Sequence, residues 1–147
     1  YHMIGLLQRV SKASVTVNNE IIESIDRGLL VFFAVHRDDD EKKIARMVDK
    51  ILSYRVFPDS NNRMNLNIKD ISGGLLIIPQ FTLAADTDKG TRANFTKAAP
   101  PEKALEFFNK FIDQCKQSHP AVVSGKFSAD MKVSLINDGP VTFWLEI

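Results

Sequence analysis

The sequence contains a single cysteine, Cys115, and no apolar run long enough to cross a membrane. One cysteine cannot form a disulfide within the chain, and it cannot hold a metal ion without other ligands. A membrane-spanning helix needs about 20 mostly apolar residues, so a membrane protein is not expected. The first residues do not have the pattern of a secretory signal, so we expect none, and we expect Tyr1 and His2 to be vector-derived residues ahead of a native Met3. These features fit a reducing compartment, so we expect a cytoplasmic protein.

The chain also lacks an excess of charge, because 19 basic residues nearly balance 18 acidic ones and leave a net charge of +1. Proteins held on nucleic acid by bulk electrostatics carry a clear basic excess, so we expect no DNA partner. If RNA is the partner, the contact is local, because each phosphate contact adds salt-dependent affinity that an enzyme must later release.

The usual catalytic side-chain signatures are missing as well. His2, His36 and His119 lie near no Ser, Cys or acid in a hydrolase motif, and we expect His36 and His119 to be surface or capping groups. Cys115 falls on the inward side of an amphipathic segment and is expected to be a buried structural thiol. The acidic run Asp38–Asp40 is expected to be a solvated helix cap. With no phosphate loop or paired metal ligands, the sequence predicts no metal and no cofactor.

Four apolar segments predict β-strands. Residues 4–10 are mostly apolar, residues 15–17 alternate between apolar and polar, and Asn18-Asn19 is a turn signal. Residues 29–35 form an unbroken apolar run, which is typical of a strand covered on both faces. Residues 74–83 predict another apolar strand.

Two segments have the period of an amphipathic helix. The first has cap candidates at Asp38–Asp40 and is closed by Pro58, and a polar loop, Asp59–Asn67, follows it. The second is opened by Pro100-Pro101 and ended by His119-Pro120. The inward stripes are Ile44, Met47, Val48, Ile51 and Leu52 in the first helix, and Ala104, Phe108, Phe111, Ile112 and Cys115 in the second.

The C-terminal part predicts two or three further strands, among them Met131–Ile136 and Val141–Ile147. Trp144 lies on the face opposite to Phe143, and we expect that face to be covered, for which a second subunit is one candidate. The order of elements predicts one α+β domain, residues 3–147, with a curved, barrel-like β-sheet packed by two amphipathic helices.

Two short motifs are the most informative parts of the chain, Pro79–Leu83 in the middle and Asn137–Thr142 near the end. With their separation and flanking residues, they resemble the D-aminoacyl-tRNA deacylase family along nearly the whole chain. The resemblance implies the same α+β fold. It also implies an enzyme that hydrolyses the ester between a D-amino acid and tRNA, with the aminoacyl-tRNA acceptor end as its partner.

The resemblance assigns the catalytic positions to Gln80, Phe81 and Thr82, at the floor of a pocket. It implies that the amides of Phe81 and Thr82 stabilise the oxyanion and that the 2′-hydroxyl of the terminal ribose assists the reaction. From the residues alone, Phe81 can equally be a core residue and Thr82 an ordinary strand residue.

The second motif supplies selectivity in the same picture. The resemblance implies that Gly139-Pro140 is a cis dipeptide that projects into the pocket of the other subunit, where its carbonyls exclude an L side chain. The enzyme would then be a homodimer with cross-subunit active sites. Glycine would be accepted, including glycine mischarged on tRNA(Ala). Arg9 matches a position expected to hold the Gly-Pro loop, and a solvated arginine is the alternative.

Further positions follow from the resemblance. Phe127 and Met131 are expected against the terminal adenosine, although both can equally be core residues. Lys89 and Arg92 are expected to meet phosphates near the acceptor end, although a solvated loop is equally consistent with them. Pro79 stands where the family has serine, and because the mechanism uses backbone amides further along, we predict that activity is retained.

Two other functions remain open. A non-catalytic RNA-binding or interaction module could keep the same fold, and the replacement at Pro79 favours it. A Thr82-dependent amidase or esterase is the second alternative, but the sequence supplies Thr82 with no base.

Overall fold

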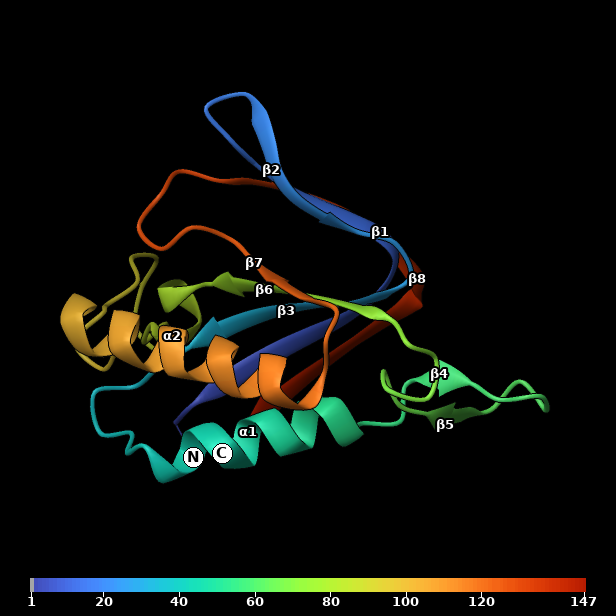
Figure 1. Cartoon of the computed structure of the whole chain (residues 1–147). Helices are drawn as coiled ribbons and strands as arrows, with labels where there is room; N and C mark the ends of the chain where they lie inside the picture. The colour runs from blue at the N-terminus through green and yellow to red at the C-terminus, as the bar shows by residue number, and fades with distance from the viewer. Residues whose placement is uncertain (1) are drawn as a thin grey trace.

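The computed structural model describes residues 2–147, and its first strand, β1 (Ile4–Val17), organises the sheet (Figure 1). The first half of β1 pairs with antiparallel β3 (Gly28–Ala34), and its second half pairs with antiparallel β2 (Glu20–Ile25). Along most of its length β1 also pairs with antiparallel β8 (Lys132–Glu146). The N-terminal strand therefore joins both ends of the described chain into one sheet.

The sheet continues from β3 through parallel strands, so it is mixed. Beyond β3 lie β6 (Gly74–Pro79) and then β7 (Val122–Ser124). A separate hairpin of β4 (Phe57–Pro58) and β5 (Met64–Leu66) projects from the end of the sheet (Figure 1). The sheet is nearly closed into a barrel, as the sequence predicts.

Both helices lie on the same side of the sheet and contact one another (Figure 1). Helix α1 (Lys42–Ser53) and helix α2 (Pro101–Ser118) bury the predicted stripes against the sheet, except that Ala104 is half-buried. The rings of Phe33 on β3 and Phe111 on α2 stack at 4.2 Å between centroids. Apolar burial of this kind is the main stabilising contribution to such a core.

Some boundaries differ from the sequence prediction. Helix α1 ends at Ser53 and not at Pro58, which lies in β4, and the predicted polar loop 59–67 contains β5. The two predicted strands 131–136 and 141–147 are one strand, β8, because register shifts in its pairing with β1 absorb the residues between them. The strand segments 4–10 and 15–17 are likewise one strand.

The acidic run before α1 does not cap the helix as predicted. The N-cap residue is Glu41, whose side chain makes no capping hydrogen bond. Asp39 is buried, accepts a hydrogen bond from the His36 amide at 2.7 Å and pairs with Lys43 at 3.0 Å. A carboxylate with these two partners is satisfied inside the protein, so it is not a solvated cap.

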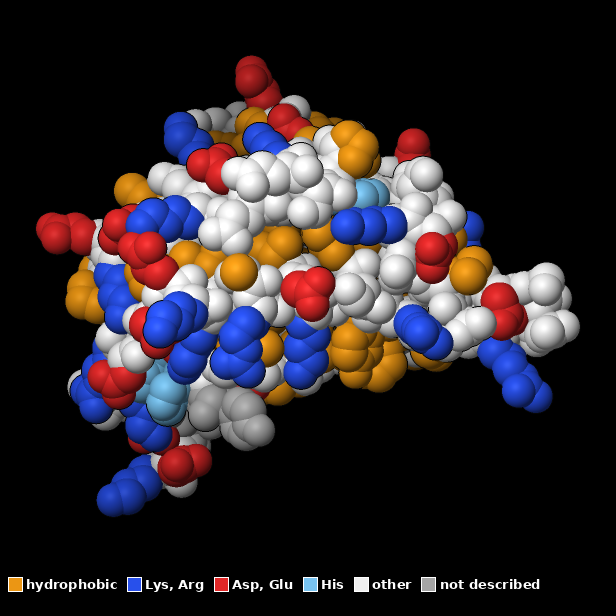
Figure 2. Space-filling view, turned by 60° about the horizontal axis from the view of Figure 1, so that its bottom comes forward, with side chains coloured by type: hydrophobic (Ala, Val, Ile, Leu, Met, Phe, Trp, Pro, Cys, Tyr) orange, Lys and Arg blue, Asp and Glu red, His pale blue; other side chains and the backbone are white. Residues whose placement is uncertain are grey.

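The surface is of mixed charge. Figure 2 shows Lys and Arg side chains interspersed with Asp and Glu side chains on this face, with no large region of one sign. None of the helices in residues 2–147 has the length and apolar character that crossing a membrane requires.

Candidate active site

A cavity of about 680 Å³ opens where β3 and β6 end, beside the start of α2. Its wall is mostly apolar and aromatic. The residues that line it are Phe33, Ala34, Val35, Ile78, Pro79, Gln80, Phe81, Phe95, Ala98, Ala99, Pro100, Pro101, Ala104, Phe108, Phe127, Ser128, Ala129, Met131 and Val133. None of these lining residues has a side chain that ionises near neutral pH. The polar side chains in the wall are the uncharged Gln80 amide and Ser128 hydroxyl, so chemistry in this cavity would use these groups, backbone groups or groups that the substrate brings.

The first motif forms one rim of the cavity. Strand β6 ends at Pro79, which is opposite Phe33 in the parallel ladder, and the amide of Gln80 donates to the Phe33 carbonyl at 2.9 Å. A proline is tolerated at this strand end because the Phe33 carbonyl is already satisfied by the next residue.

The chain then turns into a single 3₁₀ turn, η1 (Phe81–Ala84). The first amides of such a helix have no partner within it. Among the described residues, the Phe81 and Thr82 amides donate no hydrogen bond, whereas the Leu83 amide donates to the Gln80 carbonyl at 3.2 Å. The motif therefore leaves two adjacent main-chain donors without an acceptor in the described chain, on Phe81, which lines the cavity, and on Thr82, which follows it.

The Thr82 side chain is engaged within the motif. The Gln80 side-chain amide donates to the Thr82 hydroxyl at 2.5 Å, and Thr82 is exposed and not among the cavity-lining residues. A threonine nucleophile needs a base that takes its proton, and Gln80 is not one. This arrangement does not favour a Thr82-dependent amidase or esterase.

Five of the residues singled out from the sequence come together in the cavity wall: Pro79, Gln80, Phe81, Phe127 and Met131. Gly125 permits part of this arrangement, because a Cβ there would lie 2.8 Å from the Met131 sulfur and 2.9 Å from a methyl of Ile78. Any larger residue at 125 would displace the wall.

Sequence reasoning missed other parts of the wall. Phe108 was expected only as core, Pro100-Pro101 only as a helix start, and Phe95 had no expected role. One signal in the sequence could have indicated that Pro100-Pro101 lies in the wall. This pair begins a helix shortly after the first motif, so the start of α2 lies near the end of β6.

The second motif lies on β8, away from the cavity of its own chain. The Gly139-Pro140 bond is cis, and both residues are exposed and not among those that line the cavity. Arg9 holds this segment by donating through Nε to the Asp138 carbonyl at 2.9 Å, while its Nη1 donates to the Val56 carbonyl at 2.6 Å.

The two expected tRNA-binding cations are on the loop between η1 and α2. Lys89 and Arg92 are exposed there and do not line the cavity. Within the described residues neither takes part in an ion pair, so both charges are available to a ligand at the surface.

His36 and His119 are not at the surface, and of the two expected roles only the capping one is confirmed, because His119 is the C-cap residue of α2. His36 is buried, and its burial, together with the neighbouring His2, lowers its pKa. His119 is buried too, and its Nε2 lies 2.6 Å from the Gly73 carbonyl. Both are satisfied structural residues that lie outside the cavity wall.

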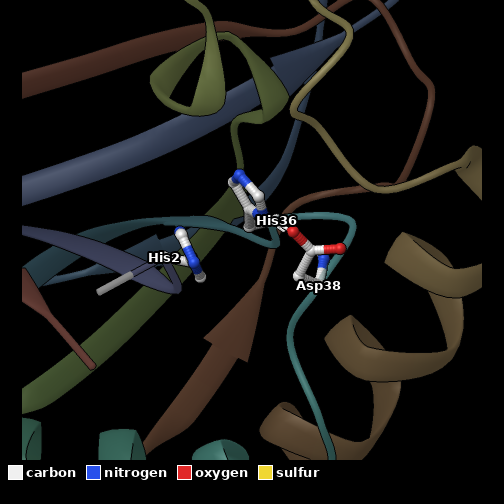
Figure 3. A group of neighbouring side chains, drawn as sticks. All are labelled: His2, His36 and Asp38. Carbon is white, nitrogen blue, oxygen red and sulfur yellow. Dashed lines mark hydrogen bonds and ion pairs between the residues drawn. The ribbon is translucent and has the colours of Figure 1, made fainter.

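Figure 3 shows His2, His36 and Asp38, a group whose ligand atoms lie close enough to be considered for a metal ion. The two imidazole rings stack face to face with centroids 3.9 Å apart. The His36 Nδ1 accepts a hydrogen bond from the Asp38 amide at 3.1 Å, so its lone pair is already used. A metal ion at His36 Nδ1 would have to displace this bond.

Cys115 is buried, as predicted, in the core that α2 shares with the sheet. Burial raises the pKa of its thiol to about 12. A thiol that stays protonated is a poor nucleophile, so Cys115 is structural.

Known proteins resemble this chain over nearly its whole length. A family model described as D-Tyr-tRNA(Tyr) deacylase matches residues 6–146. The chain is 55% identical to a D-aminoacyl-tRNA deacylase of Vibrio cholerae, over 98% of this chain and 99% of the relative. It is 48% identical to a D-aminoacyl-tRNA deacylase of Escherichia coli, over 99% of this chain and all of the relative.

Solved structures show the same fold. A protein described as c-Myc DNA Unwinding Element Binding Protein superposes with a TM-score of 0.94 and 38% identity, covering 98% of each chain. A protein described as a probable eukaryotic D-amino acid tRNA deacylase superposes with a TM-score of 0.87 over 99% of each chain, at 17% identity.

These matches first define the class, which is that of ester hydrolases that edit aminoacyl-tRNA. Within this class, the chain belongs to the D-Tyr-tRNA(Tyr) deacylase family.

Proposed function

We propose that this protein hydrolyses D-aminoacyl-tRNA with main-chain donors at the first motif and with a hydroxyl of the substrate. The observation that carries the proposal is the pair of free amides at Phe81 and Thr82, beside a cavity whose lining has no ionisable side chain. An aminoacyl ester is already activated relative to an amide, so positioning and charge stabilisation can suffice without a protein nucleophile.

In the proposed reaction, a water oxygen forms a bond to the ester carbonyl carbon. The carbonyl electron pair moves to its oxygen, and the Phe81 and Thr82 amides stabilise that negative charge. The bond between the carbonyl carbon and the ribose oxygen then breaks. The ribose oxygen keeps the electron pair and takes one proton from the water, so the products are a free D-amino acid and a tRNA with a free terminal hydroxyl.

A proton carrier is needed, and no lining side chain ionises near neutral pH, so we assign this role to the substrate. The 2′-hydroxyl of the terminal ribose is adjacent to a 3′ ester and can both donate and accept a proton. This assignment limits the enzyme to RNA esters, because the corresponding DNA end has no such hydroxyl.

The apolar wall is suited to the terminal adenosine and the amino-acid side chain. Phe127 and Met131, on the segment after β7, offer a flat ring and a polarisable sulfur to an adenine face. In the absence of an ionisable side chain, the wall selects by shape, which suits a site that takes D-amino acids of different polarity.

Selection against L-amino acids is assigned to Gly139-Pro140 of a second subunit. The dipeptide is exposed and fixed through Arg9 and Asp138, but it does not reach its own cavity. In a two-fold dimer, each subunit would place this backbone wedge in the cavity of the other. Trp144, half-exposed on the same strand, belongs to the surface that the second subunit would cover. Glycine has no side chain to be excluded, so glycyl-tRNA, including glycine on tRNA(Ala), is also a substrate.

The test is hydrolysis of D-tyrosyl-tRNA, L-tyrosyl-tRNA and glycyl-tRNA by catalytic amounts of the protein. We expect rapid loss of the D-tyrosyl and glycyl esters while the L-tyrosyl ester is spared. If a folded dimer hydrolyses none of the three, the protein is instead a binding module. If it hydrolyses the D and L esters equally, the wedge assignment is wrong.

A further inference from the structure

Two aromatic rings mark the mouth of the cavity. Phe81 and Phe95 both line it, yet 57% of Phe81 and 44% of Phe95 is exposed. Phe33 and Phe108 in the same wall are buried. Phe81 and Phe95 therefore belong partly to the cavity and partly to the outer surface.

The two rings contact one another, with centroids 5.2 Å apart and planes inclined at 57°. In such a tilted pair, the edge of one ring meets the face of the other, and ring faces remain open to the outside. We call this pair the Phe81–Phe95 platform. Exposed ring faces next to a cavity are what a planar ligand can stack on.

The loop that carries Phe95 is ordered by its own hydrogen bonds. The backbones of Asp86 and Asn94 are bonded in both directions, at 2.7 and 2.9 Å. The Asn94 side chain accepts from the Thr96 amide at 2.9 Å, and the Ala98 amide donates to the Phe95 carbonyl at 3.1 Å. The platform is thus held in place before any ligand arrives, which lowers the entropic cost of binding.

The same loop carries two exposed cations, Lys89 and Arg92, next to one exposed carboxylate, Asp88. Lys89 and Arg92 lie between Asp86 and Asn94 in the sequence, and neither forms an ion pair within residues 2–147. A ligand that stacks on the platform and also carries phosphate would meet both features. Single-stranded RNA binds proteins by this combination of aromatic stacking and backbone cations.

We propose that the Phe81–Phe95 platform stacks the base of the unpaired nucleotide that precedes the terminal adenosine. This inference rests on the proposed function, because it needs the adenosine and its amino acid inside the cavity. The preceding nucleotide is then just outside the mouth, where both rings are exposed. Any base can stack on an aromatic ring, so the platform adds affinity for tRNA without selecting a tRNA sequence.

The experiment uses three substrates of increasing length: D-tyrosyl-adenosine, the corresponding dinucleotide ester D-tyrosyl-CpA, and D-tyrosyl-tRNA. The variants are Phe95→Leu, which removes the ring, and Phe95→Trp, which keeps an aromatic face. The matched control is Leu105→Ala on α2, because Leu105 is 40% exposed but does not line the cavity.

For Phe95→Leu we expect the loss in kcat/KM to be about tenfold larger on the dinucleotide ester and on tRNA than on the adenosine ester. This is the size of effect that one lost stacking contact implies, and it should appear mainly as a higher KM. Phe95→Trp should restore most of the loss, and Leu105→Ala should show no dependence on substrate length. Equal losses on all three substrates would overturn the platform, because Phe95 would then act only on the cavity.

Two further outcomes separate the alternatives. If the wild-type protein hydrolyses none of the three esters, the proposed function fails, whereas wild-type hydrolysis with no effect of Phe95→Leu overturns the platform alone. Light scattering on each variant gives its oligomeric mass. If Phe95→Leu converts the dimer to monomers, the proposed role of the platform is also wrong. Phe95 would then be covered by a second copy of the chain and not by a nucleotide.

Discussion

Phe81 lines the cavity and offers two different groups, a half-exposed ring and a backbone amide that donates no hydrogen bond within the described residues. Substitution of the side chain changes the first group and leaves the second in place. Proline is the exception, because it removes the amide hydrogen. It is also well tolerated at the first position of a helical turn, where Phe81 lies. Residue 81 therefore allows the backbone chemistry to be tested directly.

We predict that Phe81→Pro lowers kcat about 10²- to 10³-fold relative to Phe81→Ala, which is the usual loss for one oxyanion donor. Both variants lack the ring, so the comparison isolates the amide. Single-turnover hydrolysis of D-tyrosyl-adenosine gives the rate, and thermal unfolding confirms that both variants are folded. Equal rates in two folded variants would show that the Phe81 amide does not stabilise the oxyanion.

At position 79, we predict that Pro79→Ser changes kcat/KM by less than about tenfold. The Phe33 carbonyl is already paired with the Gln80 amide, so serine would add a hydroxyl and an amide at a strand end that is already satisfied. Pro79→Ala is the matched control, because it restores the amide without the hydroxyl. A gain of a hundredfold or more with serine alone would mean that a hydroxyl at this position takes part in catalysis.

The residues of the candidate site were partly accessible to sequence reasoning. Residues within one motif, such as Gln80 and Phe81, were found because they are contiguous and match a family. Phe95 and Phe108 were missed as wall residues because each comes from another element and reaches the cavity only through tertiary packing. The burial of His36 also depends on its surroundings, and a lone histidine after a strand does not reveal it.

At the scale of elements, the loop between η1 and α2 depends on one carboxylate. Asp86 accepts from the Asp88 amide at 3.0 Å and pairs with Lys97 at 3.3 Å. The Asp88 amide first, and Lys97 second, lower the pKa of Asp86. Since its folded pKa is depressed, Asp86 stabilises the folded protein above the ordinary aspartate pKa of about 3.9. That contribution is lost as the pH falls through the lowered folded value.

We therefore predict that Asp86→Asn lowers the melting temperature slightly at neutral pH and that the difference from the wild type disappears in acid. The amide oxygen of asparagine can still accept from Asp88, so only the charge is removed. The measurement is the difference in melting temperature between the two proteins, from neutral pH to below the ordinary aspartate pKa. The contributions of the other carboxylates cancel in this difference. A difference that is independent of pH would contradict a role for the charge.

The sequence predicted the elements better than their ends. Both helix stripes were found because a wide apolar face of period 3.6 is typical of an amphipathic helix and of no other regular element. Strand β8 was divided because Asn137–Pro140 is typical of a turn, whereas in the structure register shifts against β1 keep it within one strand. Asp39 was assigned to a cap because the sequence does not show that the His36 amide and Lys43 need its carboxylate.

At the scale of the whole molecule, the proposed cross-subunit site makes a prediction about heterodimers. Gly139→Ala should disturb the wedge, because Gly139 has φ +146° and a Cβ there would lie 2.6 Å from a Val141 methyl and 2.9 Å from its amide nitrogen. Homodimers of this variant should hydrolyse L-tyrosyl-tRNA as well as the D ester. Pairing this variant with Phe81→Pro should restore selectivity, since the only working cavity then receives an intact wedge.

Heterodimers carrying two different affinity tags can be purified for this assay, and the ratio of D-tyrosyl to L-tyrosyl hydrolysis is the measurement. We expect a ratio close to that of the wild type, at about half the wild-type activity per dimer. A heterodimer as unselective as the Gly139→Ala homodimer would place the wedge and the cavity in the same subunit. A monomeric wild-type protein in light scattering would exclude a shared site altogether.

The pairing of β1 with β8 has a consequence for how the chain is made. Ile4 lies opposite Glu146, and Arg9 on β1 holds the carbonyl of Asp138 on β8. The residues of β1 leave the ribosome before those of β8, so this pairing cannot form until β8 has emerged. Contacts between such distant parts of a chain also form slowly, because a long loop must close first. Nascent chains in which β8 has not yet emerged should therefore be incompletely folded and lack a fixed second motif, and selectivity should appear only once β1 and β8 have paired.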